Sequence, residues 1–207
     1  NLIGIGIAVW MSSFFKGSFK TLQRKVLVTK DFLKVIKSSF GSGFAKICNV
    51  QDDDLAAIVF TSGSTGPPKG VRYLHKNFNA QIRVLSEEFK IKKGELDLVT
   101  LPVFSLFNPA LGVTSVIPEM NPTKPAKASA EKLVKAIVKH QISSAFCSPV
   151  IGKKINDYCK TNNINLGNIK RIMLAGAPAS PNLVCNLAKR LPRGEVIIPY
   201  GATEALP

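Results

Sequence analysis

The chain has 207 residues, of which 45% are hydrophobic, and its formal net charge is +15. This apolar content is enough for a packed core and excludes an intrinsically disordered chain. No stretch reaches the roughly 20 apolar residues that a membrane-spanning helix needs, and the apolar residues 2–11 lack the preceding basic region of a signal peptide.

Residues 1–50 form a basic N-terminal portion, with eight Lys and Arg residues against one Asp. The apolar residues between Phe14 and Leu22 are spaced as one face of a helix, and residues 31–39 predict a second helix. The basic residues recur at helix-like intervals, which favours solvated helix faces. Contact with an anionic membrane surface or an acidic partner protein is the alternative, because a basic amphipathic stretch suits either. No RNA-binding signature is present, so we expect no binding to nucleic acid.

After residue 50, stretches with strand and helix character alternate. Strands are expected at 56–60, 70–73, 97–101, 142–147, 169–175 and 196–198, and helices at 77–89, 129–140, 150–160 and 181–190. Such alternation predicts an α/β fold in which a parallel-rich sheet is flanked by helices on both faces. In folds of this kind, functional residues lie at the carboxyl ends of the strands.

The loop after the first of these strands reads Thr61-Ser-Gly-Ser-Thr-Gly-Pro-Pro-Lys-Gly70. Its glycines let the backbone approach a ligand, its hydroxyls donate hydrogen bonds and Lys69 adds a positive charge, so the loop suits phosphate. A Walker A loop ends in Gly-Lys-Ser/Thr, but here Pro68 precedes Lys69 and Gly70 follows it. A plain Ser/Gly linker is the alternative, although linkers rarely carry Pro-Pro-Lys-Gly-Val directly after a strand.

Two further motifs follow later predicted strands. Pro199-Tyr-Gly-Ala-Thr-Glu204 comes directly after the apolar run at 196–198, and Ala175-Gly-Ala-Pro-Ala-Ser180 follows the strand expected at 169–175. All three motifs therefore come where a parallel α/β sheet places its ligand-binding loops.

Together, the three motifs resemble the signature sequences of the adenylate-forming superfamily, which includes acyl-CoA synthetases, luciferases and the adenylation domains of peptide synthetases. The loop matches every fixed position of Thr-Ser-Gly-Ser/Thr-Thr-Gly-X-Pro-Lys-Gly, and the late motif matches Tyr-Gly-X-Thr-Glu. The resemblance implies that residues 51–207 form the AMP-binding core, as part of the large N-terminal domain of such an enzyme. Residues 1–50 either belong to that domain or precede it.

The resemblance also implies that the chain is a fragment, because members of the superfamily are much longer. The elements expected downstream are an Asp that binds ribose, a hinge, and a Lys on a small mobile C-terminal domain. Residue 1 is Asn rather than Met, and the last residue closely follows the late motif. We therefore expect this chain alone to bind nucleotide poorly and to catalyse little.

The reaction implied by the resemblance is the attack of a carboxylate on the α-phosphorus of ATP, which yields an acyl-adenylate and pyrophosphate. The expected nucleotide-binding residues come from all three motifs: Thr61, Ser62, Gly63, Ser64, Thr65, Gly66, Lys69, Gly176, Ala177, Pro178, Tyr200, Gly201 and Thr203. Tyr200 would stack on the adenine, Thr203 would reach the α-phosphate, and Glu204 would hold Mg²⁺. Lys69, Thr203 and Glu204 are the expected catalytic residues.

One stretch departs from the common pattern of fatty-acid CoA ligases. Those enzymes usually carry Leu-Pro-Leu-Phe-His, in which the His helps to gate the acyl pocket, whereas this chain reads Leu101-Pro-Val-Phe-Ser105. The following Leu-Phe-Asn-Pro-Ala-Leu-Gly looks closer to the β-lactone synthetases of bacterial olefin biosynthesis. Those enzymes adenylate a 2-alkyl-3-hydroxy acid whose own hydroxyl displaces AMP, so transfer to CoA and β-lactone formation both stay open.

A long-chain acid is the substrate that this resemblance implies. Four apolar residues of the same stretch either line a long acyl pocket or belong to the core: Val103, Phe104, Leu106 and Phe107. The alternative function for the whole chain is a non-catalytic nucleotide-binding or interaction module, tethered by its basic N-terminal portion.

The cysteines bear on the compartment in which the protein works. Cys48, Cys147, Cys159 and Cys185 show no Cys-X-X-Cys spacing and no paired His. This pattern favours reduced thiols in a cytoplasmic protein over a disulfide framework or a zinc site.

Overall fold

The computed structural model describes residues 2–4, 25–27, 49–61 and 69–204. The chain divides into two compact units, Asn1–Asn49 and Val50–Pro207. In the first unit, β1 (Leu2–Gly4) pairs in parallel with β2 (Lys25–Leu27), and neither strand was expected from the sequence. The helices expected over 14–22 and 31–39 lie outside the described residues.

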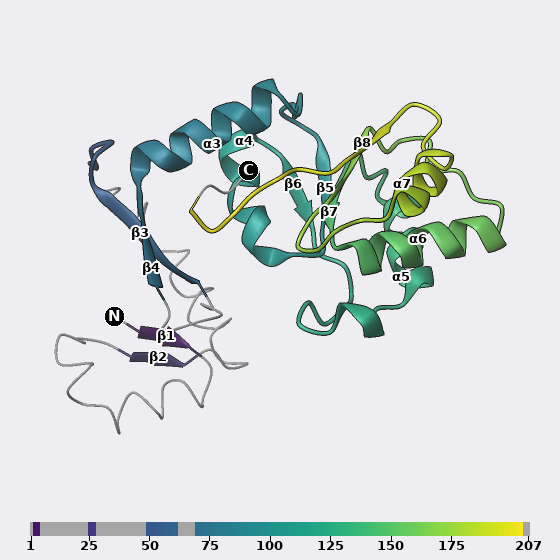
Figure 1. The fold of residues 1–207 in the computed structure, drawn as a ribbon, viewed down its shortest axis with the longest axis horizontal. Coiled ribbons are helices and arrows are strands. Elements are labelled where there is room, and N and C mark those ends of the chain that lie inside the picture. The colour runs from purple at the N-terminus through teal and green to yellow at the C-terminus, as the bar shows by residue number, and fades with distance from the viewer. Residues whose placement is uncertain (1, 5–24, 28–48, 62–68, 205–207) are drawn as a thin grey trace, which may run out of the picture. The chain divides into compact units, whose positions relative to one another are not determined.

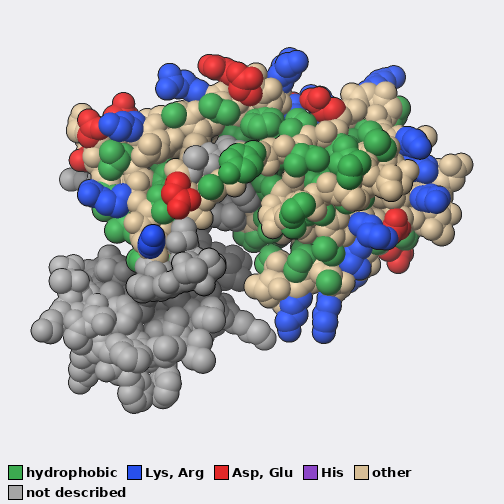
Figure 2. Space-filling model, viewed as in Figure 1, with side chains coloured by type: hydrophobic (Ala, Val, Ile, Leu, Met, Phe, Trp, Pro, Cys, Tyr) green, Lys and Arg blue, Asp and Glu red, His purple; other side chains and the backbone are tan. Residues whose placement is uncertain are grey.

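No helix in the described part of the chain is long and apolar enough to cross a membrane. On the face drawn in Figure 2, Lys and Arg side chains are spread over the surface, and acidic side chains lie among them.

The second unit begins with a β-hairpin that stands apart from the parallel sheet (Figure 1). Strand β3 (Leu55–Thr61) pairs antiparallel with β4 (Lys69–Leu74), and Thr61 lies opposite Lys69 at the end of the ladder. The sequence between these two residues is too short for a parallel crossover, which needs a dozen residues or more. The first two expected strands therefore pair with each other and not with the later ones.

Helix α3 (His75–Glu87) follows β4 without a loop. The side-chain oxygen of Asn77 accepts a hydrogen bond from the backbone N–H of Leu74 at 2.8 Å. The acidic turn before β3 packs on the same helix end, where the Asp52 carboxylate accepts a hydrogen bond from Asn79 at 2.9 Å and Asp53 pairs with Lys76 at 2.5 Å. The hairpin and α3 are thus fixed to each other by polar contacts.

The remaining strands form one parallel sheet in the order β6-β5-β7-β8-β9. They are β5 (Leu96–Val99), β6 (Thr114–Val116), β7 (Ser144–Cys147), β8 (Arg171–Leu174) and β9 (Glu195–Ile197). The helices around them are the 3-10 helices η1 (Pro102–Leu106) and η2 (Pro125–Lys127), and α4 (Asn108–Leu111), α5 (Ala130–Lys139), α6 (Pro149–Thr161) and α7 (Pro181–Ala188). The expected α/β class with a parallel sheet flanked by helices is confirmed.

Residues of the strands alternate between two apolar layers, as the period of two in a β-strand requires. Leu98, Ala145 and Ile172 point into the larger layer, which α5, α6 and α7 complete. Phe146 and Met173 point into a smaller layer on the other face, where residues of α3 and α4 cover them. Both faces of the sheet are therefore buried, as expected for parallel strands.

A buried ion pair joins the loop before β5 to the start of β8. The side chains of Glu95 and Arg171 are 4% and 5% exposed, and both carboxylate oxygens accept hydrogen bonds from the guanidinium. Lys170 also lies 3.2 Å from Glu95 Oε1. Burial by itself would raise the pKa of Glu95, but the hydrogen bonds and charges of Arg171 and Lys170 outweigh it and hold the pKa below its ordinary value.

Of the cysteines in the described ranges, Cys147 and Cys159 are buried, Cys185 is exposed, and all three are free thiols. Burial raises the pKa of the Cys147 thiol to about 12 and that of the Cys159 thiol to about 11.

Replacing Glu95 by Gln should destabilise the protein strongly, because Arg171 would keep its charge in a buried site without an ionised partner. We expect the free energy of unfolding to fall by about 3–5 kcal/mol in urea unfolding at neutral pH. Because the folded pKa of Glu95 is lowered, its contribution is complete above the unfolded pKa and is lost as the pH falls through the folded pKa. The difference between wild type and variant should therefore shrink in acid.

The matched control is Asp157→Asn, which breaks the exposed pair with Lys153 on α6. Exposed pairs contribute little, so this change should cost less than about 1 kcal/mol. An equally small loss for Glu95→Gln would contradict the assignment of a structural role to the buried pair.

Candidate functional site

The order of the strands creates a crevice at one edge of the sheet. From β5 the chain goes first to β6 on one side and then to β7 on the other, so the direction of winding reverses between β5 and β7. Ligands of open α/β sheets bind at such a reversal, outside the carboxyl ends of the strands. There the Thr100 hydroxyl donates a hydrogen bond to the Phe146 carbonyl at 2.8 Å, which holds the two strands together.

The residues expected to bind phosphate lie at the end of the hairpin. Thr61 ends β3 and Lys69 begins β4, where its side chain is exposed. The residues between them lie outside the described residues, and they include five of the expected ligands: Ser62, Gly63, Ser64, Thr65 and Gly66.

The late motif leaves the sheet after β9 and runs towards α4 and the hairpin (Figure 1). Tyr200 is 94% exposed, so its ring has a free face on which a planar ligand could stack. Gly201 and Glu204 are also exposed, whereas Thr203 is half-buried.

One hydrogen bond joins the late motif to the hairpin. The Tyr73 hydroxyl, on β4, donates to the backbone carbonyl of Thr203 at 2.5 Å across 130 positions of sequence. The Tyr73 side chain is itself held, because its ring stacks on Phe78 of α3 with centroids 5.3 Å apart and the residue is only 3% exposed. The strand that follows the Ser/Gly-rich loop is therefore tied to the Tyr-Gly-Ala-Thr-Glu motif.

The segment expected to line adenine is the turn after β8. Gly176, Ala177 and Pro178 are all exposed, and Gly176 has a φ of +86°, a conformation that side-chain-bearing residues rarely adopt. The Ser180 hydroxyl then caps α7 by accepting a hydrogen bond from the backbone N–H of Leu183 at 3.3 Å. The turn thus lies at the same edge as the late motif, since β8 and β9 are parallel neighbours.

A pocket opens under α3 and α4, on the smaller apolar layer. Its walls are mainly apolar and include Leu85, Phe89, Phe107, Leu111, Phe146 and Met173. Together with its opening to solvent, the pocket encloses about 500 Å³ of empty space. Pro199, directly before Tyr200, borders one end of it.

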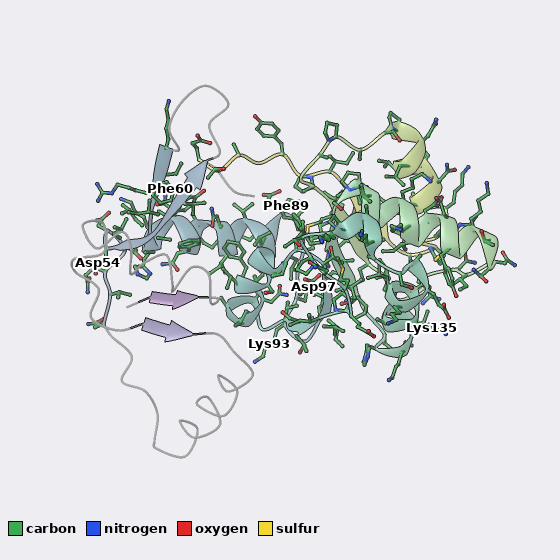
Figure 3. The ribbon with its side chains drawn as sticks, turned by 90° about the horizontal axis from the view of Figure 1, so that it is seen from below. Asp54, Phe60, Phe89, Lys93, Asp97 and Lys135 are labelled. Atoms are coloured by element: carbon green, nitrogen blue, oxygen red, sulfur yellow. The ribbon has the colours of Figure 1, made fainter. Side chains whose placement is uncertain are left out.

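The opposite end of the pocket is polar. Asp97 of β5 and Ser144 of β7 are register partners, and the Ser144 hydroxyl donates to the Asp97 carboxylate at 2.9 Å. The Asn108 amide donates to the other carboxylate oxygen at 3.1 Å and to the Ser115 hydroxyl at 2.9 Å. Burial raises the pKa of Asp97, and the hydrogen bonds from Asn108 and Ser144 offset this only in part. Figure 3 labels two of the residues that line the pocket, Asp97 and Phe89.

The stretch that departs from the CoA ligase pattern lies beside this pocket. Ser105 donates a hydrogen bond from its hydroxyl to the Pro102 carbonyl at 2.7 Å, and it is half-buried. Of the four residues suggested for an acyl pocket, Phe107 lines the cavity while Leu106 is 73% exposed. The side chains of Val103 and Phe104 lie outside the described residues.

Two groups of site residues were missed by sequence reasoning. Nothing in the sequence marks Tyr73 as a site residue, because tyrosine is common in short strands. Asp97 could have been noticed, since an acidic residue inside an otherwise apolar strand is costly to bury and indicates a polar partner. The partners Asn108 and Ser144 are distant in sequence and could not have been identified without the fold.

Removing the Tyr73 hydroxyl should loosen the late motif without disturbing the aromatic packing. Tyr73→Phe keeps the ring on Phe78, and a hydrogen bond contributes about 1 kcal/mol net. Amide hydrogen exchange at Gly201–Glu204 should therefore be about five-fold faster than in the wild type, while exchange in β8 should not change. The control is Tyr158→Phe on α6, which should leave the motif unaffected; equal exchange in both variants would contradict the tie.

The comparisons with known proteins agree with this geometry. The chain is 43% identical over 175 residues to an olefin β-lactone synthetase of Xanthomonas campestris pv. campestris, and 40% identical over 176 residues to one of Stenotrophomonas maltophilia. Each match covers 84% of this chain and 31% of the relative. The chain thus spans about a third of the length of these curated relatives.

Solved structures show the same fold at low sequence identity. A long-chain-fatty-acid-CoA ligase of Archaeoglobus fulgidus matches with a TM-score of 0.71 at 21% identity, over 99% of this chain and 43% of that one. The N-terminal domain of FACL13 from Mycobacterium tuberculosis matches with a TM-score of 0.70 at 20% identity, over 93% of this chain and 49% of that one. The family model described as AMP-binding enzyme matches residues 17–207. The chain therefore belongs to the AMP-binding enzyme family.

Proposed function

We propose that this chain contributes the nucleotide- and acid-binding part of an enzyme that activates a carboxylic acid as its acyl-adenylate. The observation that carries the proposal is the hydrogen bond from Tyr73 to the Thr203 carbonyl. It ties β4, the strand that follows the Ser/Gly-rich loop, to the Tyr-Gly-X-Thr-Glu motif, which leaves the parallel sheet after β9 at the edge where ligands of such sheets bind. Because the chain spans about a third of its relatives, the activity proposed is that of the whole protein.

In the proposed reaction, an oxygen of the substrate carboxylate attacks the α-phosphorus of ATP. A carboxyl O–P bond forms, the bond between the α-phosphorus and the bridging oxygen breaks, and pyrophosphate leaves with the bond electrons. Such a transfer needs the reactants in line and the phosphate charge neutralised, so positioning and electrostatics supply most of the catalysis.

The residues at the edge are suited to these tasks. Lys69 and the hydroxyls of the loop, with Thr61 at its start, would hold the β- and γ-phosphates. Tyr200 would offer its exposed ring to the adenine, with Gly176–Pro178 along the other side. Thr203, half-buried and fixed through its carbonyl, would meet the α-phosphate.

Glu204 is the residue that we propose for Mg²⁺. Within the described ranges, no three His, Cys, Asp or Glu side chains gather as a metal cage. Mg²⁺ commonly takes one or two carboxylates and completes its shell with phosphate oxygens and water, so one exposed carboxylate beside Thr203 fits. The ion would supply charge neutralisation on the phosphates.

For the acid, we propose a long-chain substrate of the β-lactone synthetase type. The relatives of highest identity quoted above carry that name, and Ser105 stands where CoA ligases usually carry a gating His. The apolar pocket beside the late motif supports an alkyl chain. In this version the substrate's 3-hydroxyl attacks the acyl carbonyl and AMP leaves; CoA is the acceptor in the alternative.

Replacing Lys69 or Glu204, the charged residues of the proposed site, should slow the activation of the acid by the full-length protein. For Lys69→Ala and for Glu204→Gln we expect acid-dependent release of pyrophosphate to fall by about 100-fold or more, the usual effect of removing one electrostatic contact to the reacting group. Lys139→Ala, at the exposed end of α5, is the matched control and should be unchanged. Wild-type rates in both site variants would refute the residue assignment.

A product analysis separates the two acceptors. The full-length protein is incubated with ATP and Mg²⁺ in two mixtures, a long fatty acid with CoA and a 2-alkyl-3-hydroxy acid without CoA. A β-lactone and AMP from the second mixture alone are the expected products by mass spectrometry. An acyl-CoA from the first mixture would replace the proposal by a fatty-acid CoA ligase, and binding of ATP without any product would favour a non-catalytic module.

A further inference from the structure

The pocket under α3 has two chemically different ends. Among the lining residues, Pro199 follows the carboxyl end of β9, next to the reactive edge, whereas Asp97 and Ser144 lie at the amino ends of β5 and β7, where Asn108 is hydrogen-bonded to Asp97. Between them the walls are apolar, with Phe146 and Met173 on the sheet side. A pocket with apolar walls and a polar inner end suits an alkyl chain of limited length, because an apolar chain end that buries a polar group is unfavourable.

The register of the strands gives the direction of the pocket. Asp97 pairs with Ser144, and two residues further along the strands Val99 pairs with Phe146. At about 3.3 Å per residue, the polar end lies roughly 7 Å below Phe146, away from the carboxyl edge. A chain that enters beside Pro199 therefore approaches Asp97 with its far end.

We propose that Asp97, fixed by Asn108 and Ser144, closes the inner end of the acyl pocket and sets the length of the alkyl chain that the pocket accepts. This inference rests on the proposed function, because it takes the occupant of the pocket to be the alkyl chain of the activated acid. Asp97 acts here as a specificity-determining residue and has no part in the bond-making step.

The carboxyl group is suited to this task because it cannot move aside. Each of its oxygens accepts a hydrogen bond from a different element, Ser144 on β7 and Asn108 on α4. The residue is 6% exposed, so a methyl group pressed against it would remove the remaining contact of the carboxyl with water. Arg171 and Glu95 are the nearby charged groups that act on it, with opposite signs.

The side chains that line the pocket determine how an alkyl chain enters. Most of them are apolar, and an entering chain has to push some of them aside. Phe89 and Leu111 are only partly buried and can give way. The carboxyl group of Asp97 is held by two hydrogen bonds and cannot move in this way, so we place the limit on chain length at the polar end.

The test compares four variants of the full-length protein. Asp97→Ala removes the carboxyl group and opens the inner end. Asp97→Asn replaces the carboxyl group by an amide of similar volume, and Asp157→Asn is a surface control on α6. The fourth variant, Asp97→Ser, also shortens the side chain but keeps an oxygen for Ser144 and Asn108, in case Asp97→Ala does not fold.

Two readouts use the same series of 2-alkyl-3-hydroxy acids, whose alkyl chains increase in length. The first is acid-dependent release of pyrophosphate. The second is displacement of a fluorescent fatty acid, 11-(dansylamino)undecanoic acid, which reports binding without any reaction. Thermal melting of each variant confirms that it folds.

We expect the longest acid accepted to increase by about two methylene groups in Asp97→Ala and by about one in Asp97→Ser, and to stay at the wild-type limit in Asp97→Asn and Asp157→Asn. Two more buried methylene groups correspond to about a tenfold gain in affinity for the longer acids. An unchanged length profile in folded Asp97→Ala or folded Asp97→Ser would overturn the inference.

The two readouts keep this inference separate from the proposed function. Shifted displacement profiles without pyrophosphate release in any protein would support the pocket and refute the proposed activation of these acids. Pyrophosphate release with the same length profile in all variants would support the activation and refute the role of Asp97. Displacement that does not depend on chain length in the wild type would also refute it.

Discussion

The parallel alignment of the sheet is the constraint on which the rest of residues 50–207 depends. Because β5, β7, β8 and β9 all run the same way, the segments that follow them emerge at one edge. The Gly176 turn and the Tyr200 segment become neighbours for this reason alone. The hairpin is not part of that sheet. It is joined to it by α3, which follows β4 directly and packs on the smaller apolar layer, and by the hydrogen bond from the Tyr73 hydroxyl to the Thr203 carbonyl.

Two buried acids close together in sequence show how the partner decides the role of a carboxylate. Glu95 faces the guanidinium of Arg171, so its pKa is lowered and it fastens the start of β5 to β8. Burial dominates at Asp97 and raises its pKa, because its hydrogen bonds come from the neutral side chains of Asn108 and Ser144 and the nearby charges of Arg171 and Glu95 act in opposite directions. Glu95 therefore stabilises the sheet, whereas Asp97 lines the pocket.

Much of this fold could be predicted from sequence. The strands and helices after residue 50 that were expected all exist, because the strands are short, mainly apolar runs, the apolar residues of the helices recur with a period of 3.6, and helix ends carry caps such as Ser129 and Ser180. Strand β6 was missed, because it has only three residues and two of them, Thr114 and Ser115, are polar, so they form no apolar run. Without β6, the reversal of winding beside β5 could not be predicted. The motifs indicated the nucleotide residues, but their spatial meeting and the role of Tyr73 depend on tertiary contacts between distant segments, which local patterns do not encode.

The different burial of the cysteines has a practical consequence for experiments on this chain. The thiolate is the form that reacts with maleimides, and the high pKa values of Cys147 and Cys159 keep those thiols protonated at neutral pH. Cys185 is exposed on α7, a helix whose cap, Ser180, directly follows the turn of Gly176–Pro178. A fluorophore coupled at Cys185 would therefore sit close behind the expected adenine segment, and the described part of the chain already carries a natural attachment point for an optical reporter of nucleotide binding.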